Sequence, residues 1–365
     1  MKVSLTKRFL KVYITMGRTF GTWLSFIFLG IFLLVLRIVV TFFMLLDYVF
    51  FPSLINKKIK KPIVIVGNPR SGTTFLHRYL IRNKVGAGSE LWQLIYTSVI
   101  LQKMIKPILP IMEAVSPTKY HATEAHKTSL SSIETDDASM LFRFFDGFFL
   151  YGFFLTWSKE DLFNWVDPNI RDNSNRDFKW FESMWKRTLK YHNKNRMIAK
   201  LFSVSANCPK FLDKFGDGKI LYMVRDPLSV IPSGLSLVTG VLDKKFNFWS
   251  MPLEKRQQFI DKLYDALKEL LLRFHDDWEN GKIDKSRVMI VRFDRMMGNF
   301  DDLMKDILKF LDFKPSEDFL NDILETSRKQ KEFKSSHNYN LKKFGLTEEK
   351  IKKDCEKIYN TFLSE

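Results

Sequence analysis

Hydrophobic and polar residues follow several patterns along this chain, and each pattern predicts a different kind of element. Residues 20–51 are almost continuously apolar and follow a basic stretch, 1–18, that contains no acidic residue. Short apolar runs bounded by proline, glycine or charged residues occur at 63–66, 220–224 and 288–291. Runs of this length and composition are typical of buried parallel strands.

Helical periodicity appears between these runs. One helix is predicted from Pro252 to about Gly281, and its apolar stripe consists of Phe259, Leu263, Leu267, Leu270, Phe274 and Trp278. Another follows Asp177, with an apolar face of Trp180, Phe181, Met184 and Trp185. Strands that alternate with helices predict an α/β fold, in which a parallel sheet is flanked by helices on both faces. We divide the chain into a basic, hydrophobic N-terminal segment, residues 1–60, and an α/β domain, residues 61–365.

The apolar segment predicts contact with a membrane. A secretory signal peptide would have a shorter apolar region and a cleavage site of small residues, which this segment lacks. Arg37 and Asp47 interrupt residues 20–51, and the part before Arg37 is shorter than the roughly 20 apolar residues of a full span. A tilted spanning helix, a re-entrant pair, a helix in the interface and a buried helix of the domain all remain open. Because both flanks are basic, we favour a monotopic anchor whose two ends face the cytosol.

The composition limits the kinds of binding partner and the cellular compartment that we expect for this protein. The formal net charge is +17, but the basic residues are scattered and form no recognised nucleic-acid motif, so nucleic acid is not expected. Cys208 and Cys355 cannot build a disulfide framework, and neither has the spacing of a metal ligand. Together with the absence of an Asn-x-Ser/Thr site, this favours a catalytic domain on the cytosolic side of the membrane.

A glycine-rich loop follows the first predicted strand. Residues 67–74 read Gly-Asn-Pro-Arg-Ser-Gly-Thr-Thr, which has the spacing of a Walker A loop except that Thr73 replaces the lysine. Such a loop, placed before a helix, binds phosphate with backbone N–H groups. Arg70 supplies a cation with bidentate geometry. Without the lysine, and without a clear magnesium-binding carboxylate, magnesium-dependent cleavage of a nucleoside triphosphate is disfavoured.

A second anion site is predicted after the second strand. Arg225 begins an Arg-Asp-Pro turn, and Ser233 follows eight residues after Arg225, so that a guanidinium and a hydroxyl lie close enough to bind a phosphate monoester.

Taken together, the two motifs resemble the sulfotransferase superfamily that uses 3′-phosphoadenosine-5′-phosphosulfate, in particular its bacterial-type, membrane-proximal branch. The resemblance covers about residues 62–313 and implies a P-loop-like sheet and transfer of a sulfonate group without a metal. It assigns the 5′ side of the donor to Arg70, Ser71, Gly72, Thr73 and Thr74, and the 3′-phosphate to Arg225 and Ser233. Many relatives have Lys-Ser-Pro before the second strand, whereas this chain has Lys200 followed by Leu, Phe and Ser. Lys200 is expected to serve the transferring group.

The acceptor hydroxyl requires a general base, which is usually His or Glu. Glu134 is the first candidate, because it begins a run of acidic residues, and His126 is the second. The aromatic run 142–157, together with the apolar segment, suggests a lipophilic alcohol such as a sterol or lipid as the acceptor.

Two alternatives stay open. One is a P-loop-type kinase or nucleotide hydrolase, and the other is a catalytically silent membrane-bound protein that binds the nucleotide. The kinase or hydrolase requires the lysine that this loop lacks. The silent protein can be distinguished from an enzyme only by an activity assay.

Overall fold

The computed structural model describes residues 2–116, 129–332 and 340–364. Its helices and strands, in chain order, are α1 Leu5–Phe20, α2 Trp23–Phe50, β1 Ile63–Val66, α3 Thr73–Arg82, α4 Leu91–Ile95, α5 Val99–Ile105, α6 Leu109–Val115, α8 Ala138–Phe144, α9 Phe148–Phe153, α10 Ser174–Tyr191, β2 Ile198–Lys200, α11 Cys208–Lys214, β3 Lys219–Val224, α12 Pro227–Phe246, α13 Leu253–Glu279, β4 Val288–Arg292, α14 Phe293–Gly298, α15 Phe300–Phe310, α16 Glu317–Glu332, α17 Glu348–Asp354 and α18 Glu356–Ile358.

The four strands form one parallel sheet in the order β2-β1-β3-β4. Ile65 in β1 pairs with Lys200 on one side and with Leu221 on the other. Carboxyl ends of parallel strands meet at one edge of a sheet, so the loop after β1, the end of β2 and the turn after β3 all lie at that edge. The sequence patterns missed β2, because three residues are too few to show a period.

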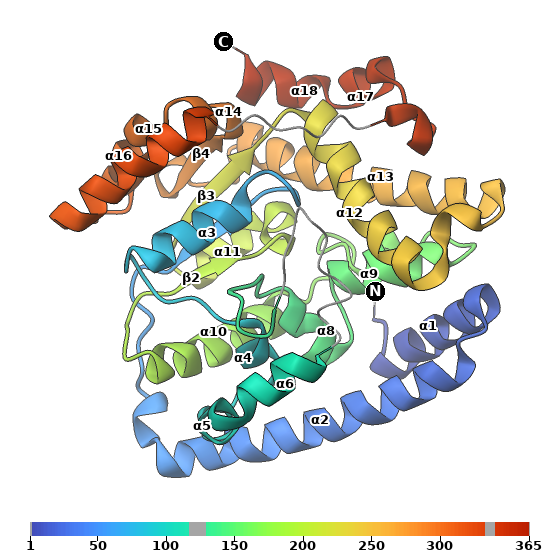
Figure 1. The fold of residues 1–365 in the computed structure, drawn as a ribbon, viewed down its shortest axis with the longest axis horizontal. Helices are drawn as coiled ribbons and strands as arrows, with labels where there is room; N and C mark the ends of the chain where they lie inside the picture. Colours follow the sequence, from blue (N-terminus) through green and yellow to red (C-terminus); the bar gives the residue numbers. More distant parts are fainter. Residues whose placement is uncertain (1, 117–128, 333–339, 365) are drawn as a thin grey trace.

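Helices cover both faces of the sheet, as predicted (Figure 1). Alternate strand residues enter two different hydrophobic cores. Val64 and Tyr222 pack on the side of α10, α11, α12 and α13, whereas Ile65 and Leu221 pack on the side of α3, α15 and α16. The α/β prediction is therefore confirmed, and the predicted long helix is α13, which starts directly after Pro252.

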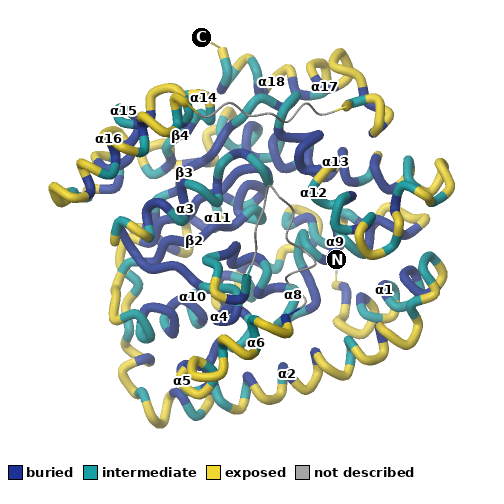
Figure 2. Tube along the Cα trace, viewed as in Figure 1, coloured by how far each residue is buried: buried dark blue, intermediate teal, exposed yellow. Residues whose placement is uncertain are grey.

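The N-terminal helices α1 and α2 form a hairpin that turns at Gly21, which has φ of +67°. The two helices approach closely, since a Cβ on Gly30 would lie 2.4 Å from the ring of Phe9. The longer helix, α2, continues through Arg37 without a break. Among the described helices, α2 alone is long and apolar enough to cross a membrane, and only 22% of its apolar window is buried. Figure 2 shows the exposed positions along its outer side.

Two buried ion pairs join this hairpin to the α/β domain. Arg8 in α1 lies 3.5 Å from Asp146, and Nε of Arg187 in α10 donates to Asp47 in α2 at 2.8 Å. The side chains of Asp47 and Arg187 are almost completely buried. These ion pairs join residues on the two sides of the predicted boundary at residue 60. The boundary therefore marks a change in composition, and the hairpin packs against the α/β domain.

Candidate active site

The phosphate loop connects β1 to α3. Gly72 has φ of +88°, and a Cβ at this position would lie 2.4 Å from Cε of Met296, so the position requires glycine for both conformation and space. Arg70 also has a positive φ, of 78°, which is uncommon for a residue with a side chain. Thr73 is the first residue of α3, so backbone N–H groups at this end of the helix are available to an anion.

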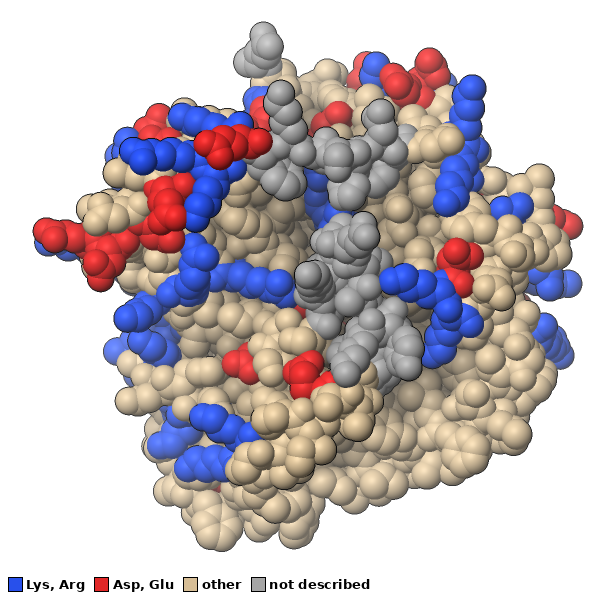
Figure 3. All heavy atoms as spheres, viewed as in Figure 1, with Lys and Arg blue, Asp and Glu red and all other residues tan. Residues whose placement is uncertain are grey.

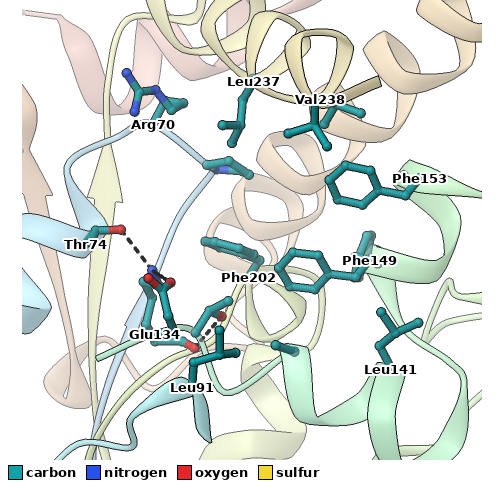
Figure 4. A pocket seen from close by; sticks show the side chains of 18 of the residues that line it. Arg70, Thr74, Leu91, Glu134, Leu141, Phe149, Phe153, Phe202, Leu237 and Val238 are labelled. Carbon is teal, nitrogen blue, oxygen red and sulfur yellow. Dashed lines mark hydrogen bonds and ion pairs between the residues drawn. The ribbon is translucent and has the colours of Figure 1, made fainter. Parts of the chain in front are cut away.

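A cluster of polar side chains lies beside this helix, where β2 ends. Lys200 is 2% exposed, and its Nζ donates to Oγ1 of Thr74 at 2.9 Å. The same Nζ lies 3.9 Å from Oε2 of Glu134. Arg78 donates from Nη2 to Oε1 of Glu134 at 2.9 Å. Figure 4 shows Thr74 and Glu134 facing each other across this cluster.

Burial determines the electrostatics of the cluster. Desolvation lowers the pKa of Lys200, while Glu134 opposes that effect. The His77 side chain is fully buried, and its Nε2 donates to the Ile198 carbonyl at 2.9 Å. Desolvation together with Lys200 lowers the pKa of His77 to about 3. His77 is therefore a packed, neutral side chain.

The acidic residues at 134–137 have different roles, since one faces the site and two bond to the surrounding fold. Glu134 faces the cluster, whereas Asp136 accepts a hydrogen bond from the Trp185 indole and Asp137 accepts from Ser203 and the Phe202 backbone. Burial raises the pKa of Asp137 to about 6 and the pKa of Asp136 well above its ordinary range. Asp137 thus holds the segment that follows Lys200 and β2, whereas Asp136 ties the acidic run to α10.

The second predicted anion site adjoins the loop. Nε of Arg70 donates to Oγ of Ser233 at 3.0 Å, and Nη1 of Arg225 donates to the Arg70 carbonyl at 2.9 Å. The Arg225 guanidinium also lies 4.1 Å from the centre of the Phe293 ring. The two motifs, which are more than 150 residues apart in the sequence, are thus in contact in the fold. Arg70 of the first motif is bonded to Ser233 and Arg225 of the second. The assignment of Arg70 to the 5′ side of a donor stays a prediction.

Both parts of the site open into one cavity of about 2040 Å³. Its polar end includes Arg70, Thr74, Glu134, Lys200 and Arg225. Its other walls are mainly apolar, and the labelled Phe149, Phe153, Leu237 and Val238 lie opposite the polar cluster in Figure 4. Much of the predicted aromatic run lines this space, although Trp157 does not and packs on Phe259 instead.

The structure therefore brings together almost all of the predicted site residues. His126 lies outside the described residues, so its candidacy as a base stays a prediction. Arg78 was missed, although its spacing of four residues from Thr74 on one helix face was a usable signal. Phe293 was also missed, because nothing in its neighbourhood distinguishes it from a core aromatic. Among residues 2–116, 129–332 and 340–364, no three His, Cys, Asp or Glu side chains gather as a set of metal ligands.

A parallel sheet whose first strand leads through a glycine-rich loop into a helix defines a P-loop-like α/β fold. A sequence model of the Sulfotransferase family matches residues 62–318, and the chain belongs to this family. The sulfotransferase STF1 from Mycobacterium tuberculosis H37Rv has a similar structure, with a TM-score of 0.67 and 17% identity over 96% of this chain and 90% of that chain. The sulfotransferase STF9 from Mycobacterium avium gives a TM-score of 0.64 and 15% identity over 88% and 82% of the two chains. At these identities the likeness establishes the fold. No curated protein matches the chain in sequence.

Proposed function

We propose that the protein transfers a sulfonate group from 3′-phosphoadenosine-5′-phosphosulfate to a hydroxyl of a lipophilic acceptor, beside a membrane. The observation that carries this proposal is the position of Glu134, Lys200 and Thr74, which lie where the phosphate loop meets an aromatic cavity. One end of the cavity suits a charged donor, and the other suits an apolar acceptor.

The residues at the polar end fit this donor. The loop around Gly72 leads directly into α3 at Thr73, where backbone N–H groups at the start of the helix suit an anion. Arg225 and Ser233 would hold the 3′-phosphate, with Arg70 between the two anion sites. Ser71, Thr73 and Thr74 would hold the 5′ side.

The donor supplies an activated sulfonate, and the side chains of the cluster act on the acceptor and the leaving oxygen. In this reaction the acceptor oxygen forms a bond to sulfur, the bond from sulfur to the 5′-phosphate oxygen breaks, and adenosine 3′,5′-bisphosphate leaves. Glu134 takes the acceptor proton, and Arg78 holds its carboxylate in position. Lys200, which is almost completely buried, neutralises charge on the transferring group and the leaving oxygen.

The setting supports a lipophilic acceptor and a cytosolic catalytic domain. The cavity extends to Leu29 and Leu33 of α2, so its apolar wall is continuous with the hydrophobic hairpin. Cys208 and Cys355 are both buried, free thiols, which agrees with a reducing compartment.

The test combines binding with transfer. Detergent-solubilised protein is titrated calorimetrically with adenosine 3′,5′-bisphosphate and with ATP, each with and without a chelator. Transfer from radiolabelled donor is then measured against sterols, lipids and phenols. We expect the bisphosphate to bind without magnesium, ATP to bind far more weakly, and lipophilic alcohols to be labelled. A preference for magnesium and ATP would favour the kinase alternative, and donor binding without any transfer would favour the silent one.

A further inference from the structure

One side of helix α2 packs against α1 and against the α/β domain. Its buried positions form a single stripe, consisting of Phe26, Leu33, Leu36, Val40, Met44 and Asp47. This stripe contacts α1 near its start, α8 near its middle and α5 near its end. The opposite side is exposed and apolar, and includes Leu24, Phe28, Ile31, Val35, Ile38, Phe42, Leu45 and Val49. In Figure 3 the lower edge of the molecule, along α2, is almost free of charged side chains.

This packing is incompatible with a helix that spans a bilayer. Crossing would pull α2 away from the domain and separate Asp47 from Arg187, which are almost completely buried. It would also place Arg37 near the bilayer centre, because Arg37 lies at the middle of α2, and would break the hydrogen bond from Arg143 to Thr41. A helix that lies flat keeps all of these contacts and still buries its outer face in lipid.

Basic side chains accompany both ends of α2. At its end, Nζ of Lys103 lies 4.8 Å from the centre of the Phe51 ring and Nζ of Lys190 lies 5.8 Å from it. At its start, the last residue of α12, Phe246, stacks on Phe20 at 4.2 Å and brings the preceding lysines of α12 to the hairpin. Cations at both ends of one apolar ridge match the phosphates of an anionic membrane surface.

The cavity opens beside this ridge. Phe28 and Phe32 line the cavity, yet they are 69% and 52% exposed. Val241 and Lys245 of α12 line it on the other side. The outer face of α2 and the acceptor end of the cavity therefore meet at the same opening.

We propose that α2 lies in the plane of an anionic membrane surface and that the acceptor passes from the bilayer into the cavity between α2 and α12. The orientation of α2 stands by itself, whereas the path of the acceptor rests on the proposed function. Phe28 and Phe32 form the lipid-side wall of the opening, and Lys245 marks its rim at the level of the headgroups.

The orientation is tested with single cysteines on the full chain. Cys208 and Cys355 are buried, so cysteines placed at Leu24, Ile31, Ile38 and Leu45 can be labelled selectively with an environment-sensitive fluorophore. Vesicles of phosphatidylcholine and phosphatidylglycerol carry nitroxides at a shallow or a deep acyl carbon. We expect equal, shallow quenching at all four positions and none at Leu253, an equally exposed site on α13.

Two results would overturn this orientation. Deep quenching that peaks at Ile38 and falls towards both ends would show a spanning helix. Absence of quenching on α2, with the protein sedimenting as a dimer, would show that a second copy covers the ridge instead of lipid.

The opening is tested with two matched substitutions. Phe28→Asp and Ile31→Asp each place a charge on the exposed ridge, but only Phe28 lines the cavity. Both should lower binding to vesicles by about tenfold or more. Transfer to cholesterol in vesicles, divided by transfer to soluble 2-naphthol, should fall by about a further tenfold in Phe28→Asp alone.

The outcomes separate the two proposals. Equal ratios in the two variants would overturn the opening while leaving sulfonate transfer intact. A wild-type protein that transfers to neither acceptor would overturn the proposed function and the acceptor path together, and the quenching measurement would still decide how α2 lies.

Discussion

Nε of Arg70 donates a hydrogen bond to Oγ of Ser233 at 3.0 Å, although the two residues are 163 positions apart in the chain. The bond joins the loop after β1 to helix α12, and Arg225 reinforces it from the end of β3 through the Arg70 carbonyl. The two predicted anion sites, which are separate in the sequence, are therefore adjacent in the fold, and substitutions in either motif should affect the same ligand.

Arg225→Ala should lower the affinity for adenosine 3′,5′-bisphosphate by about 1.5–3 kcal/mol, since a charged hydrogen-bond donor is lost. Calorimetry measures the change. Arg295→Ala is the matched control, because Arg295 pairs with exposed Asp306 and does not line the cavity. Equal affinity in Arg225→Ala and wild type would remove the second anion site from the proposal.

Glu134→Gln keeps the shape of the side chain and removes the base. Turnover should fall by about 10²–10⁴, the usual range for general base catalysis, while donor affinity stays the same. Single-turnover kinetics with saturating donor measure the chemical step. Near-normal turnover would assign the base to another residue, and His126 would be the next to substitute.

Lys200→Met should lower the turnover of the protein while leaving its thermal stability nearly unchanged. Lys200 is fully buried, and methionine fills a similar volume without a charge to desolvate, while Arg78 still neutralises Glu134. Thermal unfolding should thus show no loss beyond about 1 kcal/mol, whereas turnover should drop by about 10² or more. A variant that loses stability and keeps its turnover would make Lys200 a structural residue.

The sequence predicts the strands of the sheet better than it predicts the contacts within the candidate site. The runs at 63–66, 220–224 and 288–291 and the stripe of α13 are local patterns, so the α/β fold and the position of the loop follow from them. The contact between Glu134 and Lys200 is not local, because it depends on how the acidic run packs against the end of β2. The same holds for Asp136 and Asp137, which continue the acidic run in the sequence but are bonded to Trp185 and Ser203 in the fold.

Asp47→Asn tests whether α2 belongs to the folded domain. Removing one partner of a buried ion pair leaves the other charge uncompensated, so the free energy of unfolding should fall by about 3–5 kcal/mol. Urea unfolding in detergent measures this value. Lys305→Ala, at the exposed pair with Asp302, should produce no measurable change. If Asp47→Asn left the free energy of unfolding unchanged, the hydrophobic segment would not be part of the folded domain.

His77→Gln should reduce the sensitivity of the fold to acid. The pKa of His77 is about 3 in the folded protein and near 6.5 in an unfolded chain, so the unfolded state binds one more proton between these values. Stability from this group is complete above about pH 6.5 and decreases as the pH falls towards 3. Glutamine keeps a donor for the Ile198 carbonyl but does not titrate.

Unfolding measured at several pH values between about 4 and 7 isolates this contribution, because Asp137 titrates in both proteins and cancels in the difference. Parallel stability curves for His77→Gln and wild type would contradict a neutral, buried His77.

The two ion pairs that hold the hairpin also impose an order on synthesis. Asp47 leaves the ribosome 140 residues before Arg187, and Arg8 leaves 138 residues before Asp146. At a translation rate of about 5–20 residues per second, the hairpin waits for many seconds without the arginine and the aspartate that neutralise its own charges. During that interval the apolar stripe of α2 and the charges of Arg8 and Asp47 lack the partners that the α/β domain supplies in the folded chain. The hairpin therefore completes its packing only after Arg187 has been synthesised, and the rest of the domain folds onto a helix that was made first.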